Sequence, residues 1–167
     1  MNPPKDVITS LTHDSLFSDW KKQHENTFMT HFFCSLSPDF VPKTTWEIGF
    51  YNKDSKKIVV FVELEKGFEI KPEDDVFSKE TDTIEELSMD TVKLHFSDAV
   101  SLAKKKIPET FPHEQLGDGF VVLQKLEGKD VWNFTFVTKS VKFANIRLDA
   151  VSGDLVSSQI VELVQKD

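Results

Sequence analysis

The chain has 167 residues, of which 39% are hydrophobic and 29% charged, a composition typical of one folded domain or two small ones. No apolar run is long enough to cross a membrane, and Cys34, the single cysteine, excludes an internal disulfide and any multi-cysteine metal site. The net charge of -8 lies within residues 63–90, which hold 11 acidic and 3 basic residues, so we expect no nucleic-acid partner.

The first half of the chain is expected to form one helix followed by strands. Apolar residues between 14 and 33 recur at helical spacing, so we expect a helix that Thr12 or Asp14 caps and Pro38 follows. Residues 44–51 and 57–65 alternate between apolar and polar, which predicts two strands joined by a turn. A short third strand at 68–70 is expected to end at Pro72.

The second half shows the same plan. Ser97 is expected to cap a helix that Pro108 ends. Alternating apolar residues then predict four antiparallel strands, near 120–123, 132–136, 145–150 and 155–163. Turns are expected at Glu127-Gly128-Lys129 and at Ser152-Gly153-Asp154.

The two halves resemble each other when the chain is shifted by 86 residues. The identical pairs include an aromatic residue that opens a strand and a glycine that closes a turn. These pairs are Trp46/Trp132, Phe50/Phe136, Lys53/Lys139, Lys56/Lys142 and Gly67/Gly153. The pattern predicts a duplicated unit, and the alternative is chance similarity between two amphipathic β segments.

Three segments of the second half together resemble a PepSY-type domain. They are the alanine-containing helix at 97–104, the strand at 132–136 that opens with an aromatic residue, and the strand, turn and strand at 146–156, with Asp149-Ala150 before Gly153. The resemblance covers residues 91–167. The first half joins it only through the internal similarity, with Glu63 in the place of Asp149. The resemblance implies a non-catalytic module that binds proteins or restrains peptidases, usually outside the cytoplasm.

The hairpin at 124–128 is similar to the Gln-x-Val-x-Gly hairpin of cystatins, which enters the cleft of papain-like proteases. Gln124 and Gly128 match that motif, and Leu126 replaces its valine. The Pro-Trp of the second cystatin loop is absent, and no arm containing glycine precedes Ser97. An ordinary hairpin in which Gly128 supplies a positive φ is the alternative interpretation.

A catalytic centre is not expected. His31 and Cys34 lie three residues apart on the expected first helix, a spacing that would bring a thiol and an imidazole together. Cys34 nevertheless stands among apolar residues, which favours a buried side chain. The five histidines show no metal-ligand spacing, so we expect no metal and no cofactor.

We therefore expect an α+β fold of two tandem repeats, each a helix packed on a three- or four-stranded antiparallel sheet. The repeats are placed at 8–72 and 91–167, with an acidic connector at 73–90. Residues 1–6 lack the pattern of a secretory signal, so a cytoplasmic location is expected for the sequence as it stands, and an extracytoplasmic one if a signal has been removed.

The expected function is non-catalytic binding of a protein or peptide, in the manner of a peptidase inhibitor or through an exposed strand edge, including a homodimer. The alternative is a carrier of a small apolar ligand, or an enzyme, with a cavity between helix and sheet. The residues proposed for binding are Gln124, Leu126, Gly128, Trp46 and Trp132.

Overall fold

The computed structural model describes residues 1–75 and 84–163, which form three helices and one antiparallel sheet of eight strands. The helices are α1 (Pro4–Thr12), α2 (Ser15–Gln23) and α3 (Phe96–Thr110). The strands are β1 (Thr27–Leu36), β2 (Glu47–Asn52), β3 (Lys57–Glu63), β4 (Phe68–Asp75), β5 (Leu116–Leu126), β6 (Lys129–Thr138), β7 (Lys142–Asp149) and β8 (Leu155–Glu162). The expected α+β class and antiparallel sheet are confirmed.

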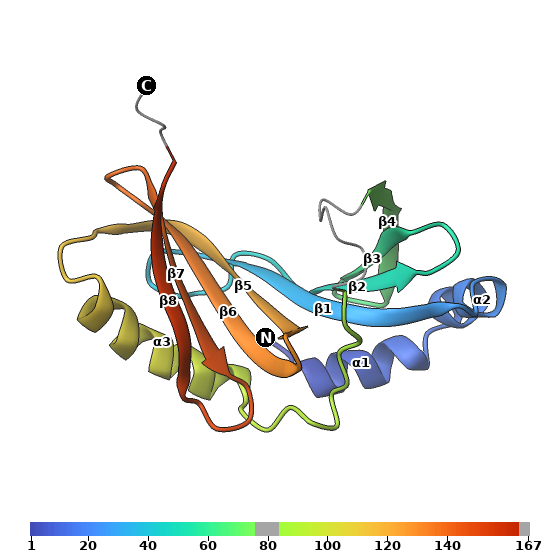
Figure 1. Ribbon diagram of the computed structural model, residues 1–167. Coiled ribbons are helices and arrows are strands. Elements are labelled where there is room, and N and C mark those ends of the chain that lie inside the picture. The colour runs from blue at the N-terminus through green and yellow to red at the C-terminus, as the bar shows by residue number, and fades with distance from the viewer. Residues whose placement is uncertain (76–83, 164–167) are drawn as a thin grey trace.

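The strands follow the order β4-β3-β2-β1-β5-β6-β7-β8. Each half of the chain supplies four consecutive strands, and the two sets join where β1 pairs with β5, for example Phe32 with Leu123. The sheet is therefore continuous, whereas the sequence predicted two sheets packed together. Figure 1 shows the three helices on one face of this sheet, and the strands at both ends curve away from the helices.

One row of side chains on the helix-covered face crosses every strand, and its six central members are at most 1% exposed. In strand order the row is Ile70, Phe61, Ile48, Phe32, Leu123, Trp132, Leu148 and Leu155. Only its end members reach solvent, since Ile70 is 37% exposed and Leu155 41%. The apolar core is thus one layer between the sheet and the helices.

The expected helix at 14–33 is wrong. Helix α2 ends at Gln23, residues 27–36 form β1, and the expected single helix is preceded by a further one, α1. Phe28 and Phe32 fit helical spacing, but Phe32 and Cys34 also fit the two-residue period of a strand, and both are fully buried. Pairing of β1 with two neighbouring strands decides between the two patterns.

Two expected helix boundaries also differ. Helix α3 begins at Phe96, so Ser97 lies inside it and is not its cap, and the side chain of His95 at the N-cap position makes no capping hydrogen bond. The helix continues past Pro108 to Thr110. Proline is tolerated there because it lies in the last turn and is exposed to solvent, which hydrates the carbonyl group left without its donor.

Strand β4 likewise continues past Pro72, to Asp75. The pairing register shifts between Ile58 and Val60, and this bulge accommodates Pro72, which cannot donate a backbone hydrogen bond. The expected acidic connector therefore begins within a strand, and its residues 76–83 lie outside the described part of the chain. Beyond them Leu87 is buried, and its N–H donates to the Met29 carbonyl at 2.9 Å.

Candidate functional site

The hairpin at 124–128 forms at the predicted position, as the tip between β5 and β6. Glu127 and Gly128 have φ values of 49° and 79°, the left-handed conformations of a type I′ turn. The Gly128 N–H donates to both carboxylate oxygens of Glu85, at 3.0 and 3.2 Å. The tip is thus joined to the segment before α3, a contact that no sequence pattern indicated.

A hollow of about 430 Å³ lies beside this hairpin on the helix-free face, and both Gln124 and Leu126 line it. His31 faces Gln124 across the β1–β5 pair and lies over Gly49, where a Cβ atom would come within 2.1 Å of the imidazole ring. Burial lowers the pKa of His31 to about 4, and the nearby Glu47 carboxylate only partly opposes this effect. The imidazole is therefore neutral at physiological pH.

Trp46 and Trp132, proposed from the sequence as binding residues, do not reach the surface. Their exposed fractions are 0% and 1%, and both indoles lie in the core between sheet and helices. Each indole N–H is satisfied by a backbone carbonyl, that of Asn2 for Trp46 and that of Leu94 for Trp132. Neither side chain offers surface to a partner.

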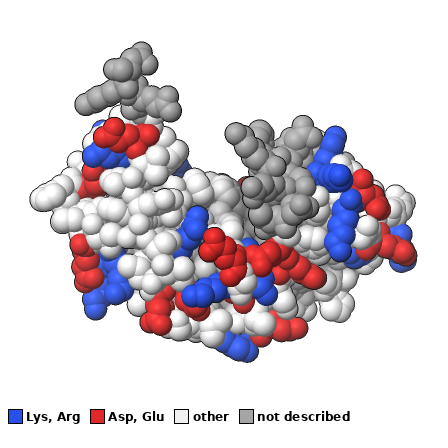
Figure 2. Space-filling model, viewed as in Figure 1, with Lys and Arg blue, Asp and Glu red and all other residues white. Residues whose placement is uncertain are grey.

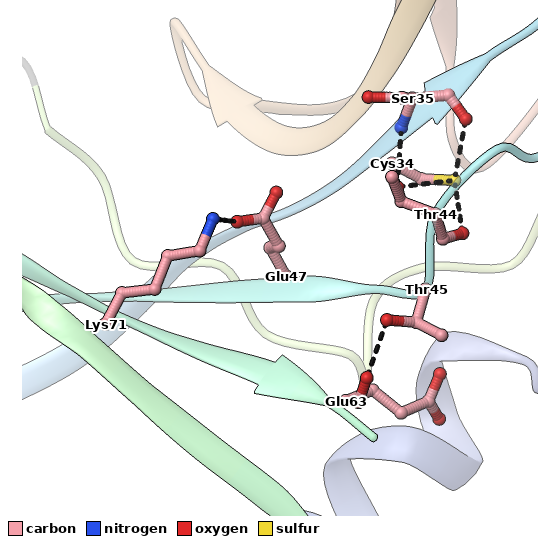
Figure 3. A network of polar contacts seen from close by, with 7 residues as sticks. All are labelled: Cys34, Ser35, Thr44, Thr45, Glu47, Glu63 and Lys71. Carbon is pink, nitrogen blue, oxygen red and sulfur yellow. Dashed lines mark hydrogen bonds and ion pairs between the residues drawn. The ribbon is translucent and has the colours of Figure 1, made fainter. Parts of the chain in front are cut away.

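His31 and Cys34 do not form the pair that a helix would have allowed. Both lie on β1, where residues three apart point to opposite faces of the sheet. The Cys34 thiol donates to the carbonyls of Ser35 and Thr44, at 3.3 and 3.5 Å (Figure 3). Burial raises the pKa of this thiol, so it remains protonated and is a poor nucleophile.

The outer strand β4 carries features that protect the edge of a sheet from other strands. Its exposed residues include Glu69, Lys71 and Pro72. The Lys71 ammonium forms an ion pair with Glu47 on β2, and Thr45 next to β2 donates to the Glu63 carbonyl at 2.6 Å (Figure 3). Charges and proline on an edge strand discourage pairing with another chain.

The opposite outer strand, β8, lacks these features. Between Asp154 and Glu162 its sequence contains no charged residue and no proline. Seven of its eight residues are exposed, among them Val156, Ile160 and Val161 at 40%, 41% and 47%. In Figure 2 the side of the molecule that holds β7 and β8 shows a broad area without charged residues.

In the described ranges 1–75 and 84–163, no group of three or more histidine, cysteine or acidic residues is arranged to hold a metal ion. None of the helices in those ranges is long and apolar enough to span a bilayer.

Comparisons with known proteins leave the family open. The sequence matches no protein-family model and no curated protein. Among solved structures, the chain is similar to the crystal structure of a candidate lipoprotein from Clostridium difficile 630, with a TM-score of 0.49 and 10% sequence identity. The similarity covers 87% of this chain and 90% of that one.

Proposed function

We propose that this protein is a non-catalytic binding module that accepts an extended segment of another protein along the edge of β8. The observation that carries the proposal is the difference between the two outer strands of one sheet. The exposed part of β4 bears charges and a proline, whereas β8 presents apolar side chains beside backbone groups that no further strand pairs among the described residues. Such an edge can pair with a strand from another chain.

Charge indicates what kind of strand fits. The uncharged stretch of β8 is flanked by the exposed acidic residues Asp154 and Glu162, and the whole chain carries a net charge of -8. If two copies paired antiparallel about Ser158, Asp154 of each copy would face Glu162 of the other, and like charges opposite each other destabilise a strand pair. The favoured occupant is therefore a segment with an apolar centre and basic ends.

A duplicated, PepSY-like origin belongs to the same proposal. Support comes from Gly67 and Gly153, which aligned in the shifted sequence and have φ values of 79° and 83° in the turns before β4 and β8. In a duplicated unit β4 and β8 are equivalent strands. The difference between their exposed surfaces therefore favours a binding role for β8 that β4 does not share. The hairpin at 124–128 remains a second candidate contact, because Gln124 and Leu126 line the neighbouring hollow.

The test uses a blocked peptide of sequence Lys-Thr-Val-Thr-Val-Thr-Lys, labelled for fluorescence anisotropy. We expect saturable binding that becomes at least tenfold weaker with Ile160→Lys on β8. Ile70→Lys on β4 is the matched control, since it makes the same change at a residue of similar exposure, 37% against 41%, and should leave binding unchanged. A peptide with glutamate in place of both lysines should bind more weakly.

Two results would overturn the proposal. Equal affinity of the Ile160→Lys variant and the unchanged protein would remove β8 as the binding element. A dimer in multi-angle light scattering that Ile160→Lys abolishes would show that a second copy, and not another protein, occupies the edge.

A further inference from the structure

Arg147 is the only arginine of the chain, and it lies on the helix-free face of the sheet. Its neighbours in register are Asn133 on β6 and Ser157 on β8. The same row continues from Asn133 across β5 and β1 to Val122 and Phe33, which are apolar and half-buried.

Two buried polar atoms on this strand have no hydrogen-bond partner in the described part of the chain. They are Nε of Arg147 and Oδ1 of Asn145, a donor and an acceptor two residues apart on one face of β7. Unpaired buried polar groups are rare in native proteins because their lost hydration is not replaced. A pair of them, one donor and one acceptor, therefore calls for a functional explanation.

The orientation of the Asn145 amide is determined by its neighbours. Its Nδ2 lies 3.0 Å from the Phe134 carbonyl, which can only accept a hydrogen bond, and 2.9 Å from Oγ1 of Thr135. It also donates to Oδ1 of Asn133, at 2.6 Å. The free atom of the amide is thus its oxygen, an acceptor, and the residue is only 7% exposed.

Asp149 is the nearest acidic residue along the same face of β7, and it is engaged elsewhere. One of its carboxylate oxygens accepts the N–H groups of Val151 and Ser152, at 2.8 and 3.0 Å. The ion pairs found among the described residues are Lys43–Asp118, Lys71–Glu47 and Lys142–Glu114, and none includes Arg147. The guanidinium therefore has no carboxylate partner within the described chain.

We propose that Arg147 and Asn145 form a binding site for a carboxylate that belongs to a peptide. The guanidinium binds the carboxylate through its solvent-exposed part, and the ligand displaces the atoms that cover Oδ1 of Asn145, which then accepts an N–H from the same ligand. Arginine suits this role because its planar donors match the two oxygens of a carboxylate, and Arg147 as a whole is half-buried, so part of it is in contact with solvent. The carboxylate comes from an acidic side chain or from a C-terminus.

This site goes beyond the proposed function, because it lies on the face of the sheet and the backbone edge of β8 takes no part in it. Its experiment also uses different probes. Since the chain has one arginine, a ¹⁵N-labelled sample gives a single Nε–Hε cross-peak, which reports on Arg147 alone.

The labelled protein is titrated with acetyl-Val-Glu-Val-amide, acetyl-Val-Gln-Val with a free carboxylate, acetyl-Val-Gln-Val-amide and inorganic phosphate. We expect a saturable shift of the arginine cross-peak with one or both carboxylate peptides, which identifies the source, and none with the uncharged amide. A shift of equal size with the uncharged peptide, a shift with phosphate alone, or no shift with any probe would overturn the proposal.

Two variants complete the test, with the Asn145 side-chain amide cross-peak as reporter. Arg147→Lys should weaken binding of the carboxylate peptide at least tenfold, because an ammonium cannot match both oxygens. Lys139→Gln, at an exposed cation after β6, should leave the affinity unchanged. Should the lysine variant fail to fold, the comparison of peptides on the unchanged protein still decides the question.

Discussion

The indole rings of Trp46 and Trp132 lie with their centroids 6.3 Å apart, and each donates its N–H to the carbonyl of the residue two positions before a helix. The acceptor for Trp46 is Asn2, ahead of α1 at Pro4, and the acceptor for Trp132 is Leu94, ahead of α3 at Phe96. The two tryptophans thus hold the starts of two helices against one sheet. This matching geometry is what a duplicated unit predicts.

The matching contacts of Trp46 and Trp132 predict that substitution of either residue lowers the free energy of unfolding by a similar amount. Trp46→Phe and Trp132→Phe each remove one hydrogen bond and leave a carbonyl without its donor, so each should lower the free energy of unfolding by about 1–3 kcal/mol. Urea denaturation measures both values. If one substitution proved neutral while the other unfolded the protein, the two residues would not be structurally equivalent.

The lowered pKa of His31 predicts that the stability of the protein depends on pH. Its folded pKa of about 4 lies below the unfolded value of about 6.5, so the unfolded state binds the proton first as the pH falls. The contribution of neutral His31 to the free energy of unfolding is fully present above about pH 6.5. Acidification to about pH 4 should lower this free energy by roughly 1–3 kcal/mol.

Urea denaturation of the protein and of His31→Gln at pH 7 and pH 4.5 isolates this contribution, which the variant should lack. His13→Gln, at an exposed histidine, is the matched control and should keep the full pH dependence. Titration of the His31 ring near pH 6.5 by NMR would contradict the expectation.

The Cys34 thiol is expected to be unreactive in the folded protein. It is 0% exposed, and burial raises its pKa, so little thiolate is present at neutral pH. Reaction with iodoacetamide should be far slower than for free cysteine at pH 8, and should reach the normal rate in 8 M urea. If Cys34 in the folded protein reacted with iodoacetamide faster than free cysteine does, this result would contradict the expectation and support a nucleophilic role.

Glu85 is expected to hold the hairpin tip. Glu85→Ala removes both acceptors of the Gly128 N–H, so hydrogen exchange at that amide should become roughly tenfold faster, as for the loss of about 1.4 kcal/mol of protection. Glu86→Ala, at the exposed neighbouring glutamate, serves as control. Unchanged exchange in the Glu85 variant would show that the turn is rigid without this contact.

Local patterns predicted much of the fold. The turns at Gly67, Gly128 and Gly153 all form with positive φ, a backbone conformation that glycine adopts more readily than other residues, and the adjoining strands follow. The spacing of apolar residues predicted the wrong element at β1, because Phe28 and Phe32 fit a helix as well as a strand. The pairing of β1 with β5 joins residues 93 positions apart, such as His31 and Gln124, and no local pattern encodes it.

The candidate sites were harder to predict from the sequence, because they too depend on how distant strands pair. The uncharged stretch of β8 can be read from the sequence, but only the strand order places it at an edge. Trp46 and Trp132 were predicted to be binding residues, although their size and apolar character suit a core equally well. Arg147 had one sequence signal, as the single arginine, yet only the structure shows that its Nε is buried and without a hydrogen-bond partner among residues 1–75 and 84–163.

Hydrogen exchange of the whole backbone, with and without the lysine-flanked peptide, tests the central claim most directly. A strand that adds to β8 takes up the outward-facing amides of residues 155–162, so those amides should exchange more slowly when peptide is bound, while β4 should not change. Protection confined to residues 124–128, or found on neither edge, would contradict binding at β8.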